Sequence, residues 1–226
     1  MPERDDVGTP APDAAPDAAQ DPAPHDAPHD APHRAVHPAV QRIALLGGES
    51  SGKTTLAIAL AEALHTRWVP EYGRQRWEEL RETLSVTELV RVAQRQIEWE
   101  DEALLALASA PSDKHPATRW LVCDTTPLTT LQYCLHDHGR APAELHEMAR
   151  RPYALTVLCL PDFGFVQDGA RRDDDYRDAQ HAWTEQWLAQ HGVVPLAVTG
   201  PVAGRVQRVL QALSAIHYPL SSSSFV

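Results

Sequence analysis

The sequence predicts an α/β fold in which helices cover both faces of a parallel sheet. The first observation is that short apolar runs alternate with longer helical patterns between residues 41 and 215, as is typical of parallel sheets. The second is a glycine-rich segment between the first apolar run and the first helical pattern. The third is the composition, since 43% hydrophobic and 23% charged residues are typical of a globular domain.

The strands and helices of this fold can be assigned in order along the chain. Short apolar runs bounded by Gly, Pro or Asp are predicted strands: 42–46, 67–69, 120–123, 154–160 and 194–198. Segments with apolar residues at helical spacing are predicted helices: 56–64, 86–107, 127–138, 143–150, part of 173–191, and 202–215. The helix from residue 86 has the clearest start, because Ser85 and Glu88 form a capping-box pattern.

Two tails are expected to flank the domain at 41–215. Residues 1–40 hold nine prolines, no aromatic residue and a net charge of -6, and such a segment cannot bury enough apolar surface to fold. Histidines recur there at every fourth position, which raises the alternative of metal binding. The interleaved prolines oppose the helix that would gather those histidines on one face. Residues 216–226, with four consecutive serines, are expected to be frayed.

The net charge limits the kinds of partner that are expected, and the cysteine content indicates the cellular location. A net charge of -11 argues against nucleic acid or an anionic membrane held by bulk electrostatics. No apolar run approaches the length of a transmembrane helix, and the first residues do not show the basic-then-apolar pattern expected of a signal peptide. Three cysteines without a CxxC spacing favour a reducing, cytoplasmic location over a disulfide framework. The oligomeric state is left open.

Residues 47–54 carry the strongest functional signal. They read Gly47-Gly48-Glu49-Ser50-Ser51-Gly52-Lys53-Thr54, the G-x-x-x-x-G-K-T pattern of a phosphate-binding loop. Glycines let backbone N–H groups approach phosphate, and the next helix directs its N-terminus at the anion. The Lys53 side chain would then reach the β- and γ-phosphates, and the Thr54 hydroxyl would bind Mg²⁺. Lys53 is one of only two lysines in the chain.

The strand predicted at 120–123 ends at Asp124. A carboxylate at the end of an apolar strand is typical of a Walker B element, which lies near Mg²⁺. The alternative is an Asp that only caps the next helix. The following residue is Thr125, whereas many ATP-hydrolysing machines carry Glu there. This difference favours phosphoryl transfer to a bound acceptor.

Two further segments are candidate parts of the same site. Arg171, Arg172 and Arg177 follow the fourth predicted strand and could clamp a phosphoryl group as a lid. The alternative is a solvated charged loop. Glu71, Tyr72 and Arg74 follow the second predicted strand, at the edge of the sheet where ligands bind in open α/β folds. Here the alternative is a turn with a structural ion pair.

Taken together, these segments resemble the ribosylnicotinamide kinase domain of the NadR family, over about residues 41–213. The resemblance is carried by the following residues: 47–56, 69–74, Ala93, Gln94, Gln96, 124–125, 129–130, 166–169 and Arg171. It implies a P-loop kinase similar to nucleoside and nucleotide kinases. The implied reaction transfers the γ-phosphoryl group of ATP to the 5′-hydroxyl of nicotinamide riboside, within NAD biosynthesis.

The resemblance also implies residue roles. ATP would be bound by Gly47, Gly48, Glu49, Ser50, Ser51, Gly52, Lys53, Thr54 and Thr55, with Arg171, Arg172 and Arg177 closing over it. Mg²⁺ would be held by Thr54 and Asp124, and Lys53 would stabilise the moving phosphoryl group. Either Glu71 or Asp124 would take the hydroxyl proton. The acceptor would be bound by Glu71, Tyr72, Arg74, Gln96 and Asp124.

The chain departs from the family at several points. Neither an adenylyltransferase domain nor a helix-turn-helix precedes residue 41, so no second activity and no DNA binding are expected. Thr126 stands where the family often has Asp, and Ala170 and Arg172 differ from the usual lid. Two alternatives therefore stay open: a kinase of the same build for another nucleoside or small hydroxyl acceptor, and an ATP-binding regulatory module.

Overall fold

The computed structural model describes residues 39–110, 118–162 and 174–217. Both predicted tails lie almost wholly outside these ranges. The first strand begins at residue 39 and the last helix ends at residue 217, so each element takes two residues that had been assigned to a tail. The domain considered below lies within the unit from Val36 onward. No helix among the described residues is long and apolar enough to cross a membrane.

A five-stranded sheet forms the centre of this unit, and all its paired strands are parallel. Its strand order is β2-β3-β1-β4-β5. The strands are β1 (Ala39–Leu46), β2 (Trp68–Val69), β3 (Thr118–Asp124), β4 (Leu155–Cys159) and β5 (Leu196–Val198). Since β1 lies between β3 and β4, the loop after β1 emerges beside the ends of both neighbours. In this register Leu45 lies opposite Asp124.

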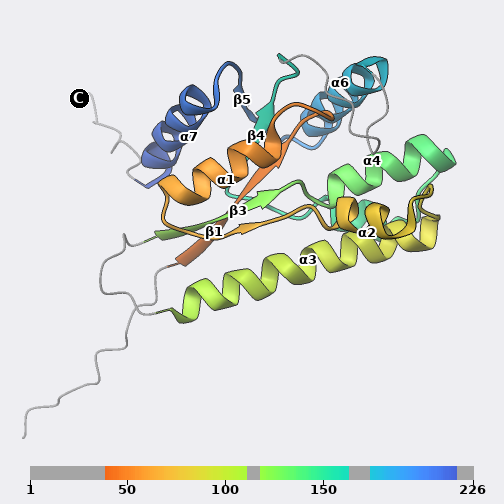
Figure 1. The fold of residues 1–226 in the computed structure, drawn as a ribbon, viewed down its shortest axis with the longest axis horizontal. Helices are drawn as coiled ribbons and strands as arrows, with labels where there is room; N and C mark the ends of the chain where they lie inside the picture. Colours follow the sequence, from red (N-terminus) through yellow and green to blue (C-terminus); the bar gives the residue numbers. More distant parts are fainter. Residues whose placement is uncertain (1–38, 111–117, 163–173, 218–226) are drawn as a thin grey trace, which may run out of the picture. The chain divides into compact units, whose positions relative to one another are not determined.

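Helices cover both faces of the sheet (Figure 1). One face is covered by α1 (Lys53–Ala63) and α7 (Val202–His217), which pack against each other. The other face is covered by α3 (Val86–Ser109), α4 (Pro127–His138) and α5 (Ala143–Ala149). Two more helices border the same side: α2 (Tyr72–Leu80) packs on α3, and α6 (Asp174–Gln190) contacts α4.

Alternate residues of the central strands enter different core clusters. In β1, Ile43 and Leu45 pack with the α1 and α7 side, whereas Leu46 packs with α3 and α4. In β3, Val122 belongs to the first cluster and Leu121 to the α3 side. A strand that is buried on both faces reads as a continuous apolar run, which is why these runs stood out in the sequence. The predicted α/β fold is confirmed.

The structure differs from the prediction at the start of β1, where strand pairing extends the strand, and at α2, a helix with many charged side chains. The strand β1 begins three residues early, because its first residues pair with the first residues of β3. The helix α2 was not predicted at all. None of its residues is buried, so it lacks an apolar stripe, and ion pairs such as Arg76–Glu79 run along its surface.

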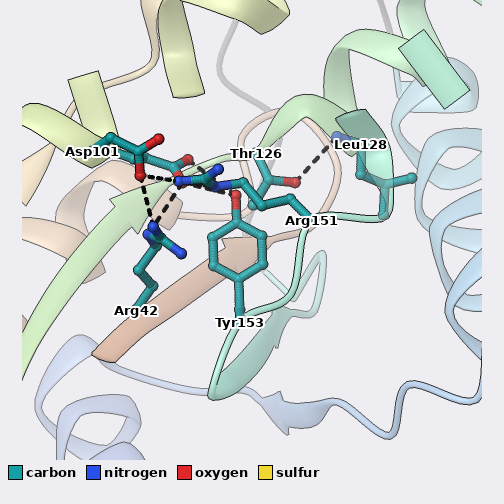
Figure 2. Close-up of polar contacts among 7 residues, drawn as sticks. Arg42, Asp101, Thr126, Leu128, Arg151 and Tyr153 are labelled. Carbon is teal, nitrogen blue, oxygen red and sulfur yellow. Dashed lines mark hydrogen bonds and ion pairs between the residues drawn. The ribbon is translucent and has the colours of Figure 1, made fainter. Parts of the chain in front are cut away.

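A cluster of charged side chains fixes α3 to the sheet (Figure 2). Glu100 is fully buried and accepts hydrogen bonds from Arg151 Nε at 3.0 Å and from the Tyr153 hydroxyl. Asp101 pairs with Arg42 of β1 at 2.7 Å and also with Arg151. Burial raises the pKa of Glu100 to about 7, although the charges of Arg151 and Arg42 oppose this shift. The cluster therefore ties the middle of α3 to β1 and to the segment before β4.

Candidate active site

A cavity of about 870 Å³ opens at the glycine-rich loop, at the end of the sheet where β1 and β3 terminate. It is lined by residues 49–55, by side chains of α2, α3 and α4, and by Gln180 of α6. Its volume lies within the range of small-molecule sites, about 300–1,000 Å³. The loop predicted to bind phosphate therefore opens into a cavity of the size that small-molecule ligands occupy.

The glycines of the loop are required by its geometry. Gly47 has φ +141°, and a Cβ atom there would lie 2.4 Å from the carbonyl oxygen of Cys159 in β4. A Cβ atom on Gly48 would lie 2.7 Å from the main-chain oxygen of Arg177 in α6. Gly52, which precedes α1, has φ +80°. The loop is thus pressed between β4 and α6, and no larger residue fits at Gly47 or Gly48 without movement.

Hydrogen bonds hold the loop in a closed turn. Lys53 Nζ donates to the carbonyl oxygens of Gly47 and Gly48 at 3.0 and 2.8 Å. The Ser51 hydroxyl donates to Gly48 at 2.8 Å. The carboxylate of Glu49 accepts from the Tyr133 hydroxyl at 2.8 Å. The predicted loop residues 47–55 are thus brought together, and those from Glu49 to Thr55 line the cavity.

Two residues that sequence reasoning missed support this loop from the C-terminal half of the chain. Gln180 of α6 accepts a hydrogen bond from the Glu49 amide at 2.8 Å. Arg205 of α7 is almost fully buried and donates to the Ser51 carbonyl at 2.7 Å, while it also pairs with Asp162. Neither lies in a recognisable motif, and each is 130 or more residues from its partner in the loop. In the sequence, Gln180 and Arg205 therefore look like ordinary helix residues.

Asp124 lies beside the first turn of α1, as the Walker B prediction requires. Its Oδ2 accepts a hydrogen bond from the Thr54 hydroxyl at 2.6 Å. Burial raises the pKa of Asp124, opposed by the hydrogen bond from Thr54 and the charge of Lys53. Its Oδ1 is buried and has no hydrogen-bond partner among the described residues.

Thr54 and Asp124 are suitable ligands for Mg²⁺. The hydroxyl and carboxylate are oxygen donors, which Mg²⁺ prefers, and Mg²⁺ usually takes few ligands from protein and the rest from phosphate and water. The described residues contain no cluster of three or more His, Cys, Asp or Glu side chains placed to hold a metal ion.

Thr125, which follows Asp124, has a strained backbone. It has φ +75°, a left-handed conformation that β-branched residues rarely adopt. Its amide donates to Leu45 of β1 at 3.1 Å, and the next residue, Thr126, is extended and caps α4 by accepting from Leu128 N. Thr125 thus adopts the left-handed conformation in the short turn between β3 and α4. Such strain is most often found at functional sites.

Glu71 lies at the start of α2 and faces the same cavity as Lys53. Burial raises the pKa of Glu71 to about 7; the charge of Lys53 opposes the shift and that of Asp124 adds to it. A carboxyl with a pKa near neutrality is suited to act as a general base. Arg74 lines the cavity one turn later and pairs with Glu78 at 3.5 Å.

Tyr72 takes a different position from the one the sequence suggested. Its ring packs edge-on against Trp99 of α3, with 5.0 Å between the ring centres, and it is not among the residues that line the cavity. Its amide donates to Gln96 Oε1 at 3.0 Å. Gln96 does line the cavity, from α3, and is 2% exposed.

The predicted lid is only partly described. Arg171 and Arg172 lie outside the described residues. Arg177 lies in the first turn of α6, is nearly buried, and packs its main chain over Gly48. It is therefore next to the loop, although it is not among the residues that line the cavity.

Most residues in the far wall of the cavity were not among the site residues predicted from the sequence. Trp77 of α2 and the apolar residues Leu84, Leu89 and Val92 line it on one side. On the other side α4 contributes the following residues: Thr129, Thr130, Tyr133 and Asp137. These four recur at helical spacing and so share one face of α4. That spacing was a usable signal, but it is equally typical of a core face.

Comparison with known proteins agrees with this geometry. A protein family described as AAA domain matches residues 42–205. The chain belongs to this family. Among solved structures, this AAA domain is similar to a NadR protein in complex with NR, at 21% identity and a TM-score of 0.57 over 80% of this chain. A NadR protein in complex with NAD and AMP-PNP is similar at 17% identity and the same TM-score, over 78% of this chain.

A thymidylate kinase from Ehrlichia chaffeensis is also similar, at 15% identity and a TM-score of 0.54, over 78% of this chain and 99% of that chain. The chain spans about half the length of the two NadR chains. At these identities the likeness concerns the fold: the AAA domain has a P-loop kinase fold similar to NadR and to nucleotide kinases.

Proposed function

We propose that this protein is an ATP-dependent phosphotransferase that acts on the 5′-hydroxyl of nicotinamide riboside and so belongs to NAD biosynthesis in the cytoplasm. The observation that carries the proposal is the placement of Glu71 on the same cavity as Lys53 and Thr54. The phosphate loop and a carboxyl group with a pKa of about 7 line one cavity. Phosphoryl transfer needs these parts: a site for the phosphates, and a base for the attacking hydroxyl.

The charges around the cavity support a nucleoside rather than a nucleotide as acceptor. Three acidic side chains line the cavity, Glu49, Glu71 and Asp137, against the two basic side chains Lys53 and Arg74 among the described residues. Lys53 belongs to the phosphate loop, and Arg74 pairs with Glu78. A nucleoside monophosphate would bring its negative charge toward these carboxylates, which is unfavourable. Nicotinamide riboside carries a positive charge on its pyridinium ring, which they favour.

The chain's own residues would share the reaction as follows. Loop amides and Lys53 would bind the β- and γ-phosphates and stabilise the charge of the phosphoryl group. Thr54 and Asp124 would hold Mg²⁺, which supplies further neutralisation of phosphate charge when bound. Because Asp124 is engaged with Thr54, Glu71 is the better placed base for the 5′-hydroxyl proton. Arg177, with Arg171 and Arg172, would close over the phosphates.

The direct test is ³¹P NMR of ATP, Mg²⁺ and purified protein with nicotinamide riboside, with ordinary nucleosides and thymidine monophosphate in parallel. Formation of ADP and a phosphomonoester from nicotinamide riboside alone would support the proposal, and a Lys53→Ala variant should form both far more slowly. Phosphorylation of another nucleoside instead would replace the acceptor while keeping the reaction. ATP bound but consumed with no acceptor would favour a regulatory module.

A further inference from the structure

A second cavity, of about 320 Å³, lies on the face of the sheet that α3, α4 and α5 cover. Its floor is formed by Ala44 and Leu46 of β1 and Thr156 of β4, and its walls by the start of α4, the segment after α5 and the end of α6. Figure 2 shows four residues of the lining: Thr126, Leu128, Arg151 and Tyr153. None of the described residues lines both this cavity and the one at the phosphate loop, so the two cavities are separate.

The lining of this second cavity is basic. It includes Arg150, Arg151 and His191, whereas none of the described residues that line it is Asp or Glu. This contrasts with the net charge of -11 for the whole chain and with the carboxyl groups that line the phosphate-loop cavity. Because a cleft lined by charge of one sign attracts ligands of the opposite sign, the lining favours an anion.

Arg150 is the arginine that is available to such an anion. Arg151 is held by ion pairs with Glu100 and Asp101 (Figure 2). Arg150 pairs with Glu147 at 2.9 Å, and both side chains of this pair are more than half exposed. Exposed pairs of this kind contribute little to stability, so the Arg150 guanidinium can turn to a ligand at small cost.

Two threonine hydroxyls give the cavity hydrogen-bond donors. Thr156 is 9% exposed, and its hydroxyl has no hydrogen-bond partner among the described residues, although its oxygen is not one of the atoms sealed from solvent. Thr126 Oγ1 accepts from the Leu128 amide at 3.2 Å, which leaves its own proton to donate. A buried hydroxyl without a partner is uncommon in folded proteins. A ligand oxygen that only accepts, as in a carboxylate, would satisfy both hydroxyls.

The rest of the lining suits a flat apolar ring. Trp187 and His191 stack on each other, with 3.8 Å between ring centres and an angle of 15°. His191 Nδ1 donates to the Trp187 carbonyl at 2.8 Å, because a carbonyl can only accept, and this bond fixes the imidazole. Leu46, Leu188 and Val193 add apolar surface. Aromatic and aliphatic walls of this kind bind aromatic ligands.

We propose that this cavity is a binding site for a small aromatic carboxylate. The ring packs against Trp187 and the apolar floor, and the carboxylate accepts hydrogen bonds from the threonine hydroxyls while Arg150 neutralises its charge. The site does not depend on the proposed function. It adjoins the active site, however, because Leu46 precedes Gly47 of the phosphate loop and Thr126 lies two residues after Asp124. A bound ligand would therefore contact both segments that position the catalytic end of the sheet.

The test measures binding of benzoate to the full chain by NMR of the tryptophan indole N–H groups. The chain has six tryptophans, and the resonance that is absent from Trp187→Phe belongs to Trp187. Benzoate should shift this resonance with a Kd on the order of 1 mM, as is typical of so small a ligand. Benzamide, which lacks the charge, and acetate, which lacks the ring, should each bind about tenfold more weakly or worse.

Two variants locate the carboxylate. Arg150→Gln should weaken benzoate binding on the order of tenfold, the effect of one charged hydrogen bond. Arg91→Gln is its matched control, because Arg91 forms the same type of exposed pair with Glu88 and lines neither cavity. Thr156→Val keeps the shape of the side chain and removes no hydrogen bond of the fold, so it should weaken benzoate binding severalfold without lowering the melting temperature.

Three outcomes would overturn the inference. If benzoate at 10 mM leaves the Trp187 resonance unmoved, on the scale of Kd expected for such ligands, the cavity is not a site. If benzamide binds as tightly as benzoate, or Arg150→Gln binds like the wild type, the ligand class is wrong. If saturating ATP or Lys53→Ala abolishes benzoate binding, the anion occupies the phosphate loop instead. None of these outcomes bears on the proposed kinase reaction, which the ³¹P assay tests by itself.

Discussion

Replacement of Glu71 by Gln tests the electrostatics of the cavity without any substrate. The folded-state pKa of Glu71 is about 7, against 4.5 for an exposed glutamate. The stability linked to its proton is therefore fully present below about pH 4.5 and is lost as the pH rises to about 7. At about 1.4 kcal/mol per pH unit, this loss amounts to about 3 kcal/mol at pH 8. A glutamine side chain does not titrate, so the Glu71→Gln variant should not show this loss.

The assay is urea unfolding of both proteins between pH 4.5 and pH 8. The free energy of unfolding of Glu71→Gln minus that of the wild type should rise by about 3 kcal/mol across this range. With an m value of about 2 kcal/mol/M, the difference in unfolding midpoint between Glu71→Gln and the wild type should be about 1.5 M urea larger at pH 8 than at pH 4.5. Other titrating groups, including Glu100, are common to both proteins and cancel in the difference.

One control variant and one independent readout make this prediction specific. Glu62→Gln removes an exposed glutamate on α1 and should follow the wild type at every pH. The rate of the proposed phosphoryl transfer by the wild-type protein should rise with pH through about 7, as Glu71 loses its proton and becomes a base. Parallel stability curves for Glu71→Gln and wild type would refute the argument that burial controls this carboxyl.

Three further variants test the phosphate loop. Lys53→Ala should lower kcat by about 10²–10³ in a steady-state assay with its melting temperature nearly unchanged; an equal loss of fold and activity would contradict a direct role. Gly47→Ala should weaken ATP binding in calorimetry and destabilise the protein by at least about 2 kcal/mol, because its Cβ would meet the Cys159 carbonyl; wild-type affinity would disprove the close approach. Arg205→Met should cost about 2–4 kcal/mol in urea unfolding, because it removes the pair with Asp162 and the hydrogen bonds to the Ser51 and Gly200 carbonyls; a variant as stable as wild type would mean that these contacts are dispensable.

The sequence predicted the parts of the site that are continuous along the chain. The spacing of Gly47, Gly52 and Lys53 determines the loop by itself, because a strand and a helix adjoin it directly. The position of Asp124 next to the loop could also be predicted, because Asp124 ends an apolar strand. The one further condition was that this strand, β3, pairs with β1, and it does. For the same reason the strands and long helices were assigned nearly correctly, as their periodicity is local.

The remaining parts depend on contacts between distant segments. Nothing in the local sequence shows that Gln180 and Arg205 bind the loop, or that the ring of Tyr72 packs on Trp99 rather than facing the cavity. The helix α2 was missed because its side chains form surface ion pairs instead of an apolar stripe. The strained Thr125 could not be recognised either, because its conformation is imposed by a pairing to Leu45 and by the cap at Thr126.

The bond from Arg205 to Ser51 has a consequence for the protein's synthesis on the ribosome. The two residues are 154 positions apart, and at about 5–20 residues per second this stretch takes about 8–30 s to translate. During that interval the nascent chain already contains the whole glycine-rich loop but lacks the side chain that fixes its backbone. The ability to bind nucleotide tightly should therefore arise late, close to the completion of the domain, rather than when the loop itself emerges.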